Sequence, residues 1–393
     1  MQILVLSHGY PPTVSGVSLV VQKVSRALVS RGHRVTVITA SERGERYRDE
    51  DQGVHLLRVR SRPNPFWTEG PIPLLGRKDL EAAIDKFRPD IIHSHDPVVL
   101  SLQLLRLGED LAIPRLLTCQ WLPRFVEPYL PKGKASRRSI HALGWKYSVN
   151  LVNQFDHVIF SSLTQRDAFA EHGLSVPNTI VSNGLDTKRY HPLNAGDEEI
   201  TARYALPPGP RILFVGRLAK DKQIDVLIEA MSLVTAQREA HLLIVGRGDD
   251  RDRLEELATD CGVAHYVRLM GFVPEEDLPG LYRASDIFAI VSACEVQSIP
   301  TLQAAATGLP IVAANAAALP ELVHDGVNGF LAPPGDHEAV SAALLRIANE
   351  PDLAERMGSA SLTIGQAHSE THTFDAYEGL YRRIAQPGMI DLA

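Results

Sequence analysis

Two cationic side chains follow a short apolar segment in the second half of the chain. Arg217 and Lys222 come directly after the predicted strand 211–215. Cations fixed at the end of a strand can stabilise the negative charge that develops on a diphosphate when its bond to a sugar breaks. Two solvated surface cations would give the same pattern. The spacing therefore indicates a candidate diphosphate site that needs support from other segments.

A carboxylate and a helix start lie together in the segment 285–315, SDIFAIVSACEVQSIPTLQAAATGLPIVAAN. We expect a buried strand over 287–291, a polar loop with Glu295, and a helix opened by Ser298, Ile299 and Pro300. Ser298 is placed to cap this helix, and proline is favoured in its first turn. The free amides and the dipole of a helix N-terminus favour phosphate binding. An ordinary βαβ crossover would show the same pattern.

The sequence of these segments resembles that of the family 4 glycosyltransferases, which transfer a sugar from a nucleotide donor with retention of anomeric configuration. The resemblance is carried by Glu295, the first glutamate of the family's "E, seven residues, E" motif, and by three stretches of sequence. At the position of the second glutamate this chain has Gln303. The three stretches are GRLAKDKQIDVLIEA, AAATGLPIVAAN and LPELVHDGVNGFLAPPGD.

The resemblance implies roles for residues on the donor side. Arg217 and Lys222 would hold the leaving diphosphate, and Glu295 would contact hydroxyls of the donor sugar. Gln303 would bind the ribose more weakly than a glutamate, because an amide has one carbonyl acceptor and no charge. The strand-end DxD of metal-dependent transferases is absent, so we expect no metal and no cofactor besides the nucleotide-diphosphate sugar. The full set expected to bind the donor is Gly16, Gly216, Gly246, Phe272, Val273, Ser298, Ile299, Thr301 and Gln303.

In the first half, three segments resemble the acceptor or sugar side of the same family. SHGYPPTVSG is similar to the family's opening, and its Gly16 would let the backbone approach a phosphate. His93, His95 and Asp96 end a predicted strand at RPDIIHSHDP. Gln120 stands where many relatives have a histidine beside the sugar's anomeric centre. An amide cannot act as a base, but retaining members are thought to need no protein nucleophile.

The composition and the alternation of elements predict a two-domain α/β protein. The chain has 393 residues, of which 45% are apolar and 22% charged, too long for one ordinary domain. Short apolar strands alternate with helical segments, which is typical of parallel sheets covered by helices. We therefore expect two doubly wound, Rossmann-like domains facing across a cleft, the GT-B architecture. The expected domains are 1–192 for the acceptor and 193–369 for the nucleotide sugar, with a C-terminal helix over 370–388 packing back on the first.

The charge is divided unequally between the two halves. Residues 1–192 contain 25 Lys and Arg against 18 Asp and Glu, a net charge of +7, whereas residues 193–393 carry −14. Residues 128–155 contain no acid, and their basic positions include Lys132, Lys134, Arg137 and Arg138. A basic helix with apolar residues opposite can lie on an anionic bilayer. It can equally pack its apolar face on its own domain, and both interpretations stay open. The acidic second half and the missing binding motifs disfavour nucleic acid as a partner.

These observations lead to one expected function and two alternatives. We expect a retaining, metal-independent hexosyltransferase that uses a nucleotide-diphosphate sugar, foremost a UDP-sugar, and a membrane lipid such as diacylglycerol as acceptor. A soluble natural product or small polyol is the alternative acceptor. A catalytically degenerate sugar-nucleotide-binding protein is the alternative class, because Gln120 and Gln303 both depart from the family pattern. Three scattered cysteines and an opening without a signal peptide predict a cytoplasmic protein, peripheral at the inner face of the membrane.

Overall fold

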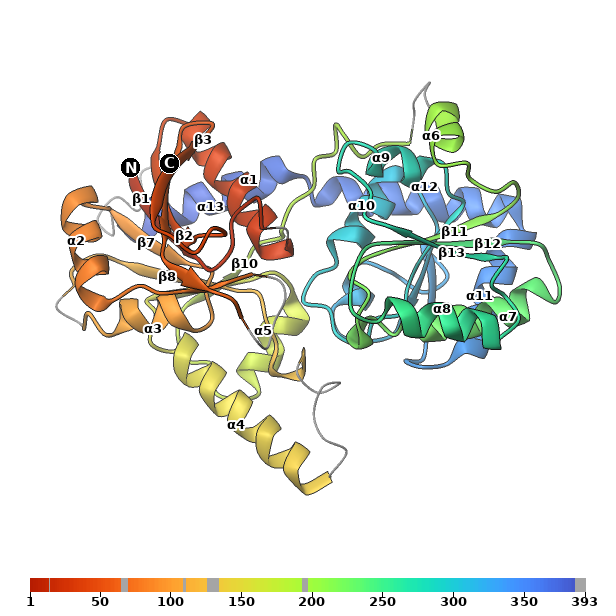
Figure 1. Ribbon diagram of the computed structural model, residues 1–393, viewed down its shortest axis with the longest axis horizontal. Coiled ribbons are helices and arrows are strands. Elements are labelled where there is room, and N and C mark those ends of the chain that lie inside the picture. The colour runs from red at the N-terminus through yellow and green to blue at the C-terminus, as the bar shows by residue number, and fades with distance from the viewer. Residues whose placement is uncertain (14, 65–69, 109–110, 126–133, 193–196, 386–393) are drawn as a thin grey trace. The chain divides into compact units, whose positions relative to one another are not determined.

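The computed structural model describes the chain except residues 14, 65–69, 109–110, 126–133, 193–196 and 386–393. The chain divides into two compact units, each with its own sheet and helices (Figure 1). The first comprises Met1–Pro123, Arg138–Asn183 and Thr371–Ala393, and the second comprises Arg124–Arg137 and Gly184–Glu370. The main division lies before residue 192, because Leu185 and Tyr190 are packed in the core of the second unit.

The first unit contains an eight-stranded sheet in the order β10-β9-β8-β7-β1-β2-β4-β3. All neighbouring strands are parallel except β3 and β4, which pair antiparallel at one edge. The strands are β1 (Gln2–Ser7), β2 (Arg34–Ala40), β3 (Tyr47–Asp51), β4 (Val54–Val59), β7 (Ile91–Ser94), β8 (Arg115–Cys119), β9 (His157–Phe160) and β10 (Asn178–Ile180). A separate two-stranded pair is formed by β5 (Ser61–Arg62) and β6 (Ile72–Pro73).

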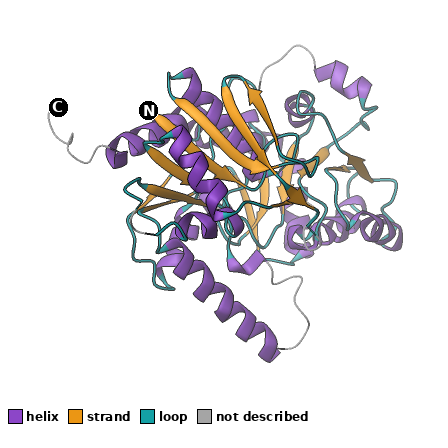
Figure 2. Cartoon of the chain, turned by 60° about the vertical axis from the view of Figure 1, so that its left-hand side comes forward, coloured by secondary structure: helices purple, strands orange, loops and turns teal. Residues whose placement is uncertain are grey.

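Helices cover this sheet, and Figure 2 shows several of them lying over its strands. Apolar side chains of the central strands are buried because both faces of a parallel sheet are covered. The helices are α1 (Gly16–Ser30), α2 (Arg77–Phe87), α3 (Val99–Leu105), α4 (Lys134–Val152), α5 (Leu163–Ala170) and α13 (Glu370–Ala385). Helix α13 is tied to the first unit by ion pairs from Arg31 to Asp375 and Glu378. The last helix of the chain therefore contacts the first unit.

The second unit contains a six-stranded parallel sheet in the order β13-β12-β11-β14-β15-β16. Its strands are β11 (Arg211–Val215), β12 (His241–Val245), β13 (Val267–Gly271), β14 (Ile287–Ile290), β15 (Ile311–Ala314) and β16 (Gly329–Ala332). Its helices are α6 (Asp197–Arg203), α7 (Ile224–Thr235), α8 (Arg251–Asp260), α9 (Leu278–Arg283), α10 (Ile299–Thr307), α11 (His337–Asn349) and α12 (Pro351–Ala367). Two doubly wound α/β units confirm the predicted fold class.

In each sheet the direction of winding reverses between two neighbouring strands. The reversal falls between β1 and β7 in the first unit and between β11 and β14 in the second. The loops that leave such a pair of strands diverge to opposite sides, and this opens a crevice at the carboxyl edge where doubly wound proteins bind ligands. These two switch points are the places to look for functional side chains.

Candidate active site

The switch point of the second unit brings together the charged residues predicted from the sequence. Arg217 and Lys222 follow β11, and Glu295 follows β14, the neighbouring strand. Lys222 Nζ donates a hydrogen bond to Glu295 Oε1 at 2.6 Å. Arg217 Nη2 donates to Asp221 Oδ1 at 3.1 Å, and Lys222 Nζ lies 3.7 Å from Asp221 Oδ2. Two cations and two carboxylates thus form one cluster.

This cluster is largely shielded from solvent. The side chains of Lys222 and Glu295 are 18% and 13% exposed, and that of Asp221 is 8% exposed. Burial opposes the charged form of Lys222, but the carboxylates of Glu295 and Asp221 outweigh this effect and raise the pKa of Lys222. Lys222 therefore stays protonated at neutral pH.

The sequence positions the cluster through a short turn and a neighbouring loop. Residues Lys220–Lys222 form a 3₁₀ turn, which places Lys222 before α7. The Ser292 hydroxyl donates to the Asp221 carbonyl oxygen at 3.1 Å and so connects this turn to the loop after β14. The carbonyl oxygen of Glu295 accepts from the amide of Ala318 at 3.2 Å. The backbone on both sides of the Lys222–Glu295 pair is therefore fixed.

Glycines let two loops of the second unit approach closely at this edge. Gly216 donates its amide to the Val245 carbonyl oxygen at 2.9 Å. A Cβ on Gly246, whose φ is +143°, would lie 1.8 Å from the carbonyl oxygen of Gly216. On Gly248 it would lie 2.1 Å from the carbonyl oxygen of Leu218. A side chain at either position would force the loops apart, so these glycines are explained by backbone packing.

Phe272 and Val273, both expected to bind the donor, follow β13 and differ in exposure. Val273 is buried, whereas the Phe272 side chain is among the exposed large apolar residues at 54%. The Arg247 guanidinium lies over the Phe272 ring, 5.0 Å from its centroid. A cation over an aromatic face makes a flat, partly apolar surface, of the kind on which planar groups stack.

Helix α10 begins as the sequence predicts. The Ser298 hydroxyl accepts from the Thr301 amide at 3.2 Å, which confirms Ser298 as the N-cap. The Thr301 hydroxyl also donates to Ser298 Oγ at 2.7 Å. Ile299 is the first helical residue and Pro300 the second. The capping hydroxyl thus satisfies one amide of the first turn of α10.

Gln303 lies between two tyrosine hydroxyls inside the second unit. Its Nε2 donates to the Tyr190 hydroxyl at 2.9 Å, and its Oε1 accepts from the Tyr282 hydroxyl at 2.9 Å. The residue is 6% exposed. Burial raises the pKa of both tyrosines, so both hydroxyls stay protonated. The amide is therefore hydrogen-bonded at both ends within the protein, and its predicted contact with a ribose stays a prediction.

The predicted residues of the first unit lie at its switch point. Helix α1 begins at Gly16, with Ser15 as N-cap, and a Cβ on Gly16 would meet nothing within 4 Å. His95 follows β7 and is 2% exposed, and Gln120 follows β8. Burial lowers the pKa of His95 to about 3, although the neighbouring Gln120 side chain opposes the shift. His95 is thus a neutral imidazole at physiological pH.

Behind His95, a chain of hydrogen bonds connects the sheet to helix α13. The rings of His93 and His95 have centroids 4.2 Å apart. His93 is hydrogen-bonded through Nδ1 to the Tyr381 hydroxyl at 2.5 Å and through Nε2 to the Thr118 hydroxyl at 2.7 Å. His93 is buried with both ring nitrogens used, which makes it a structural residue. Helix α13 therefore supports the edge at which His95 lies.

Comparison with known proteins assigns the chain to a family. The family described as "Glycosyl transferases group 1" matches residues 197–362, and "Glycosyltransferase Family 4" matches residues 14–189. Together they cover both units. The chain belongs to the family 4 glycosyltransferases.

Relatives match this glycosyltransferase over most of its length. An uncharacterised glycosyltransferase of Methanocaldococcus jannaschii is 28% identical over 89% of this chain and 90% of its own. The sulfoquinovosyl transferase of Arabidopsis thaliana is 27% identical over 92% of this chain and 68% of its own. The α-monoglucosyldiacylglycerol synthase of Streptococcus pneumoniae is 25% identical over 92% of this chain and 82% of its own.

Solved structures confirm the GT-B fold of this glycosyltransferase. The sucrose-phosphate synthase of Thermosynechococcus elongatus aligns with a TM-score of 0.83 at 22% identity, over 99% of this chain and 100% of the other. HepE of Anabaena, in complex with UDP and glucose, aligns with a TM-score of 0.77 at 19% identity, over 97% of this chain and 99% of the other.

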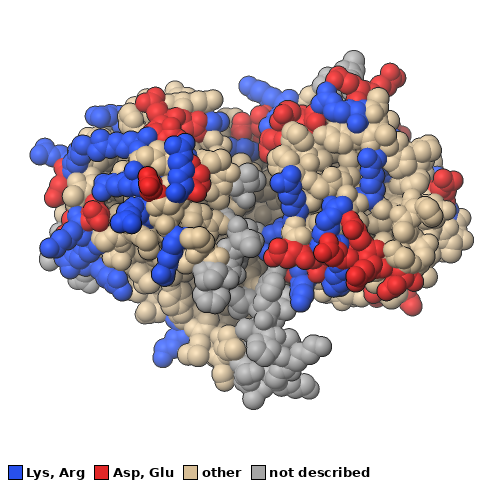
Figure 3. Space-filling model, viewed as in Figure 1, with Lys and Arg blue, Asp and Glu red and all other residues tan. Residues whose placement is uncertain are grey.

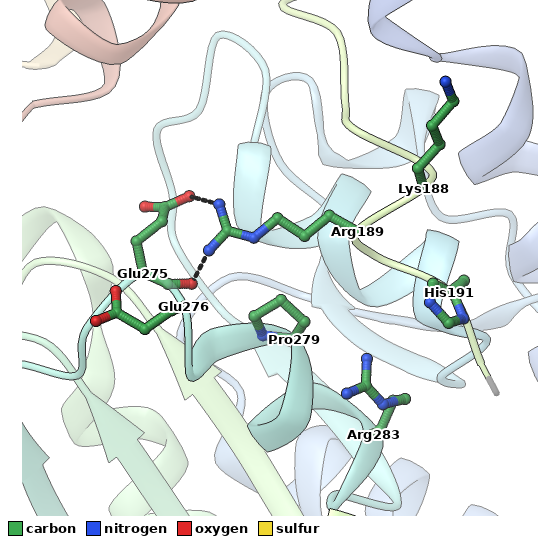
Figure 4. A pocket seen from close by; sticks show the side chains of 7 residues that line it. All are labelled: Lys188, Arg189, His191, Glu275, Glu276, Pro279 and Arg283. Carbon is green, nitrogen blue, oxygen red and sulfur yellow. Dashed lines mark hydrogen bonds and ion pairs between the residues drawn. The ribbon is translucent and has the colours of Figure 1, made fainter. Parts of the chain in front are cut away.

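A separate pocket of about 600 Å³ lies in the second unit (Figure 4). It lies between the segment that enters the unit and the start of α9. Arg189 crosses it and pairs with Glu275 at 3.3 Å. None of the residues predicted for the donor lines this pocket, so the ion-pair cluster at the sheet edge is the better candidate for donor chemistry. The lining residues are Lys188, Arg189, His191, Glu275, Glu276, Pro279 and Arg283.

Helix α4 shows features of both interpretations that the sequence left open. Trp145 and Val149 are buried against the first unit, whereas Leu143 is 65% exposed and Tyr147 42%. Ile140, one turn earlier, is 37% exposed. Of the basic residues, Lys132 and the side chains at 134, 137 and 138 lie outside the described part of the structure. No helix in the described part is long and apolar enough to cross a membrane.

The structure adds residues that the sequence did not single out. Asp221 lies between the two predicted cations, and its position inside the KDK motif could have suggested this. Tyr190 and Tyr282 hold Gln303, and no sequence signal connects residues so far apart.

On the face shown in Figure 3, basic side chains spread over the first unit while acidic ones form a band over α8 of the second. The exposed acids of α8 include Glu255 and Glu256.

Proposed function

We propose that this glycosyltransferase transfers a sugar, with retention and without a metal, from a nucleoside-diphosphate sugar to a hydroxyl of a membrane lipid. A UDP-sugar is the foremost donor and diacylglycerol the model acceptor. The observation that carries the donor half is the cluster of Arg217, Lys222 and Glu295 at the switch point of the second unit. Family membership supports the reaction class.

The charges of the cluster fit the reaction. When the bond between the sugar and the diphosphate breaks, negative charge develops on the diphosphate, and fixed cations stabilise it without reorganisation. Lys222 and Arg217 supply these cations. Their partners Glu295 and Asp221 hold them in place before a donor arrives. Donor binding is then an exchange, in which a phosphate oxygen replaces or joins a carboxylate on Lys222 and Glu295 turns to sugar hydroxyls.

The neighbouring groups suit the rest of a nucleotide donor. The amides at the start of α10 favour an anion next to Glu295. Phe272 with Arg247 offers a flat surface for a base. HepE, whose structure contains UDP and glucose, shares the fold of this chain. These features support a nucleoside-diphosphate sugar, and the HepE complex favours uridine as its base.

The acceptor half of the proposal rests on α4 and on one relative. Ile140, Leu143 and Tyr147 lie at helical spacing on one face and are exposed. An apolar face within an acid-free, basic segment matches an anionic bilayer in both charge and polarity. The name of the α-monoglucosyldiacylglycerol synthase of Streptococcus pneumoniae gives a glycosylated diacylglycerol as its product.

A donor-by-acceptor screen tests the reaction. Purified protein is incubated with UDP-glucose, UDP-galactose, GDP-mannose or ADP-glucose, each with diacylglycerol vesicles, total lipid extract or myo-inositol. We expect transfer from a UDP-sugar to a lipid, an equatorial anomeric proton by NMR because the α-linkage of the donor is retained, and no loss in EDTA. Transfer only to myo-inositol would replace the lipid by a polyol. Nucleotide binding without any product would replace the enzyme by a sugar-nucleotide-binding protein.

Vesicle co-sedimentation tests the membrane part separately. Leu143→Ser on α4 should reduce binding to anionic vesicles, because it removes the most exposed apolar side chain of that face. Leu74→Ser is the matched control, since Leu74 is 47% exposed but lies outside α4. Each basic residue near an anionic surface contributes about 1 kcal/mol, so high salt should also release the protein. Equal binding to neutral and anionic vesicles, or none to either, would overturn the lipid acceptor.

A further inference from the structure

Helix α4 lies along the carboxyl edge of the sheet in the first unit. The Tyr147 hydroxyl donates to the carbonyl oxygen of Pro97, in the loop after β7, at 2.8 Å. The Ser148 hydroxyl accepts from Trp121 Nε1, in the loop after β8, at 3.2 Å. Strands β7 and β8 are parallel neighbours, and the loops at the carboxyl ends of such strands are where a doubly wound sheet binds its ligands. Helix α4 therefore borders the ligand edge of its own unit.

One face of α4 is used to pack the helix on its unit. The Trp145 ring stacks on that of His172, with 3.8 Å between the centroids, and meets the Phe169 ring edge-on at 5.2 Å. Trp145 is buried, and so is Val149, which lies one turn later on the same side. These contacts fix the rotation of α4 about its axis, so its opposite face is directed away from the unit.

This opposite face is apolar and exposed. Ile140, Leu143 and Tyr147 follow one another at intervals of three and four residues, which places them on one side of the helix. Leu143 has the most exposed side chain of the three. In Figures 1 and 2 the N-terminal part of α4 extends away from the sheet of the first unit. A helix packed from one side only is expected to carry polar residues on the other, so this face points to an apolar partner.

The apolar face continues from α4 onto the loop after β7. Val98 follows Pro97, whose carbonyl oxygen binds the Tyr147 hydroxyl, and the Val98 side chain is 48% exposed. The backbone at this point is fixed, because Asp96 Oδ1 accepts the amide of Val98 at 2.8 Å and that of Leu100 at 3.1 Å. We call Ile140, Leu143, Tyr147 and Val98 the apolar track. It leads from the free part of α4 to the carboxyl end of β7.

The charges beside the track and the place where it ends identify its occupant. Residues 128–155 contain no acid, and Lys146, next to Tyr147 on α4, is exposed. An apolar face with a cationic flank is complementary to an anionic lipid surface. A protein partner would cover the edge at which a ligand of the first unit enters, whereas a lipid can be both the surface that α4 contacts and the ligand itself.

We propose that the apolar track binds the acyl chains of the acceptor lipid and so brings the lipid's hydroxyl to the carboxyl end of β7. This inference rests on the proposed lipid acceptor and adds the residues that recognise it. Ile140 and Leu143, at the outer end, enter the bilayer surface. Tyr147 and Val98, at the inner end, contact the chains of the bound acceptor. The outer residues therefore govern attachment to the membrane, and Val98 governs which acceptor is used.

Photolabelling tests where the acyl chains lie, without relying on turnover. The protein is irradiated on anionic vesicles containing a diacylglycerol with a diazirine in one acyl chain, and the labelled peptides are mapped by mass spectrometry. We expect labels on the peptides that contain Val98 and Tyr147, and unlabelled diacylglycerol should compete with them. Labels that stay on α4 and resist competition would mean contact with the bilayer alone, which overturns the inference.

Kinetics of Val98→Ser test the role of the inner end. The KM for long-chain diacylglycerol, expressed as its mole fraction in vesicles, should rise about tenfold, which corresponds to about 1.4 kcal/mol of lost apolar contact. Transfer to a soluble short-chain diacylglycerol and binding to anionic vesicles should change little, because neither depends on this contact. Val327→Ser is the control, the same exchange at a 55% exposed position of the second unit, and should change none of these quantities.

The outcomes separate this inference from the proposed function. If the wild type glycosylates diacylglycerol and Val98→Ser keeps its KM, the inference is wrong and the proposed function stands. Equal losses with long-chain and short-chain acceptors would mean that Val98 shapes the sheet edge and binds no chain, which also overturns the inference. A dimer in light scattering that Leu143→Ser dissociates would assign the track to a second copy of the chain instead. If the wild type transfers sugar to no lipid in the screen above, the proposed acceptor fails and the inference fails with it.

Discussion

The two switch points of this protein share a topology and differ in their chemistry. In the second unit the loops after β11 and β14 carry two cations already paired with carboxylates. In the first unit the loops after β1 and β7 carry His8, Asp96 and His95, and two of the ring nitrogens have no partner among the described residues. The switch point of the second unit is thus lined by charged side chains, and that of the first unit mainly by polar ones.

This difference matches the two halves of a glycosyl transfer. A diphosphate carries charge at every step, so its site needs cations that are held in position. Carboxylate partners hold these cations, but they also compete with the diphosphate for them. An acceptor hydroxyl carries no charge, so a site for it needs groups that form hydrogen bonds. Under the proposed function, polar atoms without a hydrogen-bond partner suit it better than fixed charges do. The comparison makes the two sites separable by mutation.

The largest effect is expected for Lys222→Ala. The change removes a transition-state contact worth about 2–4 kcal/mol, which corresponds to a rate loss of about 10²–10³. It also leaves Glu295, which is 13% exposed, without its 2.6 Å partner. Steady-state kinetics with saturating acceptor checks the rate, and calorimetry with UDP should show weaker binding.

Lys220→Ala is the matched control for this prediction. Lys220 lies in the same 3₁₀ turn but is exposed. Its removal should leave both rate and UDP affinity nearly unchanged. Equal losses in the two variants would mean that the turn, and not the charge of Lys222, is what matters. Unchanged rates in both would place the diphosphate elsewhere.

The next effect concerns Glu295→Gln, which tests the exchange of partners on Lys222. Without the Glu295 carboxylate, Lys222 loses its 2.6 Å partner and keeps Asp221 at 3.7 Å, so a phosphate meets less competition and UDP should bind more tightly than to the wild type. Transfer should nevertheless fall about 10–100-fold, because a hydrogen bond from a sugar hydroxyl to a charged acceptor, about 1.5–3 kcal/mol, is lost. Discrimination between UDP-glucose and UDP-galactose should weaken as well.

Opposite changes in UDP affinity and rate are the signature of this exchange. Glu276→Gln, an exposed glutamate of the same unit, should change neither quantity. If Glu295→Gln weakens UDP binding instead, Glu295 serves to hold Lys222 in place and does not compete with the phosphate. In that case donor binding would leave the ion pair intact.

A third prediction separates stability from nucleotide binding at Gln303. Gln303→Ala leaves the buried hydroxyls of Tyr190 and Tyr282 without the amide that bridges them. The free energy of unfolding should fall by about 1–3 kcal/mol in urea titrations. A double-mutant cycle with Tyr282→Phe should show that the two losses are not additive. Gln366→Ala on α12, an exposed glutamine, is the control and should have little effect.

The alternative outcome at Gln303 is equally clear. If Gln303 binds the ribose as the resemblance implies, UDP affinity should drop while the unfolding midpoint stays near that of the wild type. That result would mean that the amide exchanges its tyrosine partners for ribose hydroxyls when the nucleotide binds. The two readouts together therefore decide between a structural and a donor-binding amide.

Much of the fold and of the donor site could be predicted from the sequence. Strand β11 was expected at 211–215 and has these bounds in the structure, because a short apolar run flanked by turns indicates a buried strand in an alternating α/β chain. The N-cap role of Ser298 also followed from local sequence. Arg217, Lys222 and Glu295 were identified because the sequence motifs around them resemble those of the family, and the structure brings them together.

Other features depend on contacts that the sequence does not show. Strand β3 reads YRDED and has no apolar alternation, because it is an exposed edge strand that pairs antiparallel through its backbone. His8 was not singled out, since a lone histidine after a strand is ordinary until β1 and β7 are known to be neighbours. The ion pair between Lys222 and Glu295 could not be predicted from the motifs. The resemblance assigns Lys222 to the diphosphate and Glu295 to the sugar, and it says nothing about a contact between the two side chains.

The smallest effect concerns helix α13, which supports the first switch point from behind. Glu378 accepts from Arg382, from Arg31 at 2.8 Å and from His33 at 3.2 Å. The hydrogen bonds from Arg382 and Arg31 lower the pKa of Glu378 to about 2. A depressed carboxyl pKa contributes stability that is present above its ordinary value of 4.5 and is lost as the pH falls towards about 2.

Glu378→Gln should therefore lower the free energy of unfolding at pH 7 by less than about 1 kcal/mol, since these pairs are partly solvated. The gap between variant and wild type should stay constant down to about pH 4.5 and close below it, as urea titrations at a series of pH values would show. Glu355→Gln, an exposed glutamate of α12, should give no gap. Because α13 holds His93 through Tyr381, any loss of activity in Glu378→Gln should appear in the KM for the acceptor and leave UDP binding unchanged. A change in UDP affinity instead would mean that the two switch points are not independent, and the comparison between them would have to be given up.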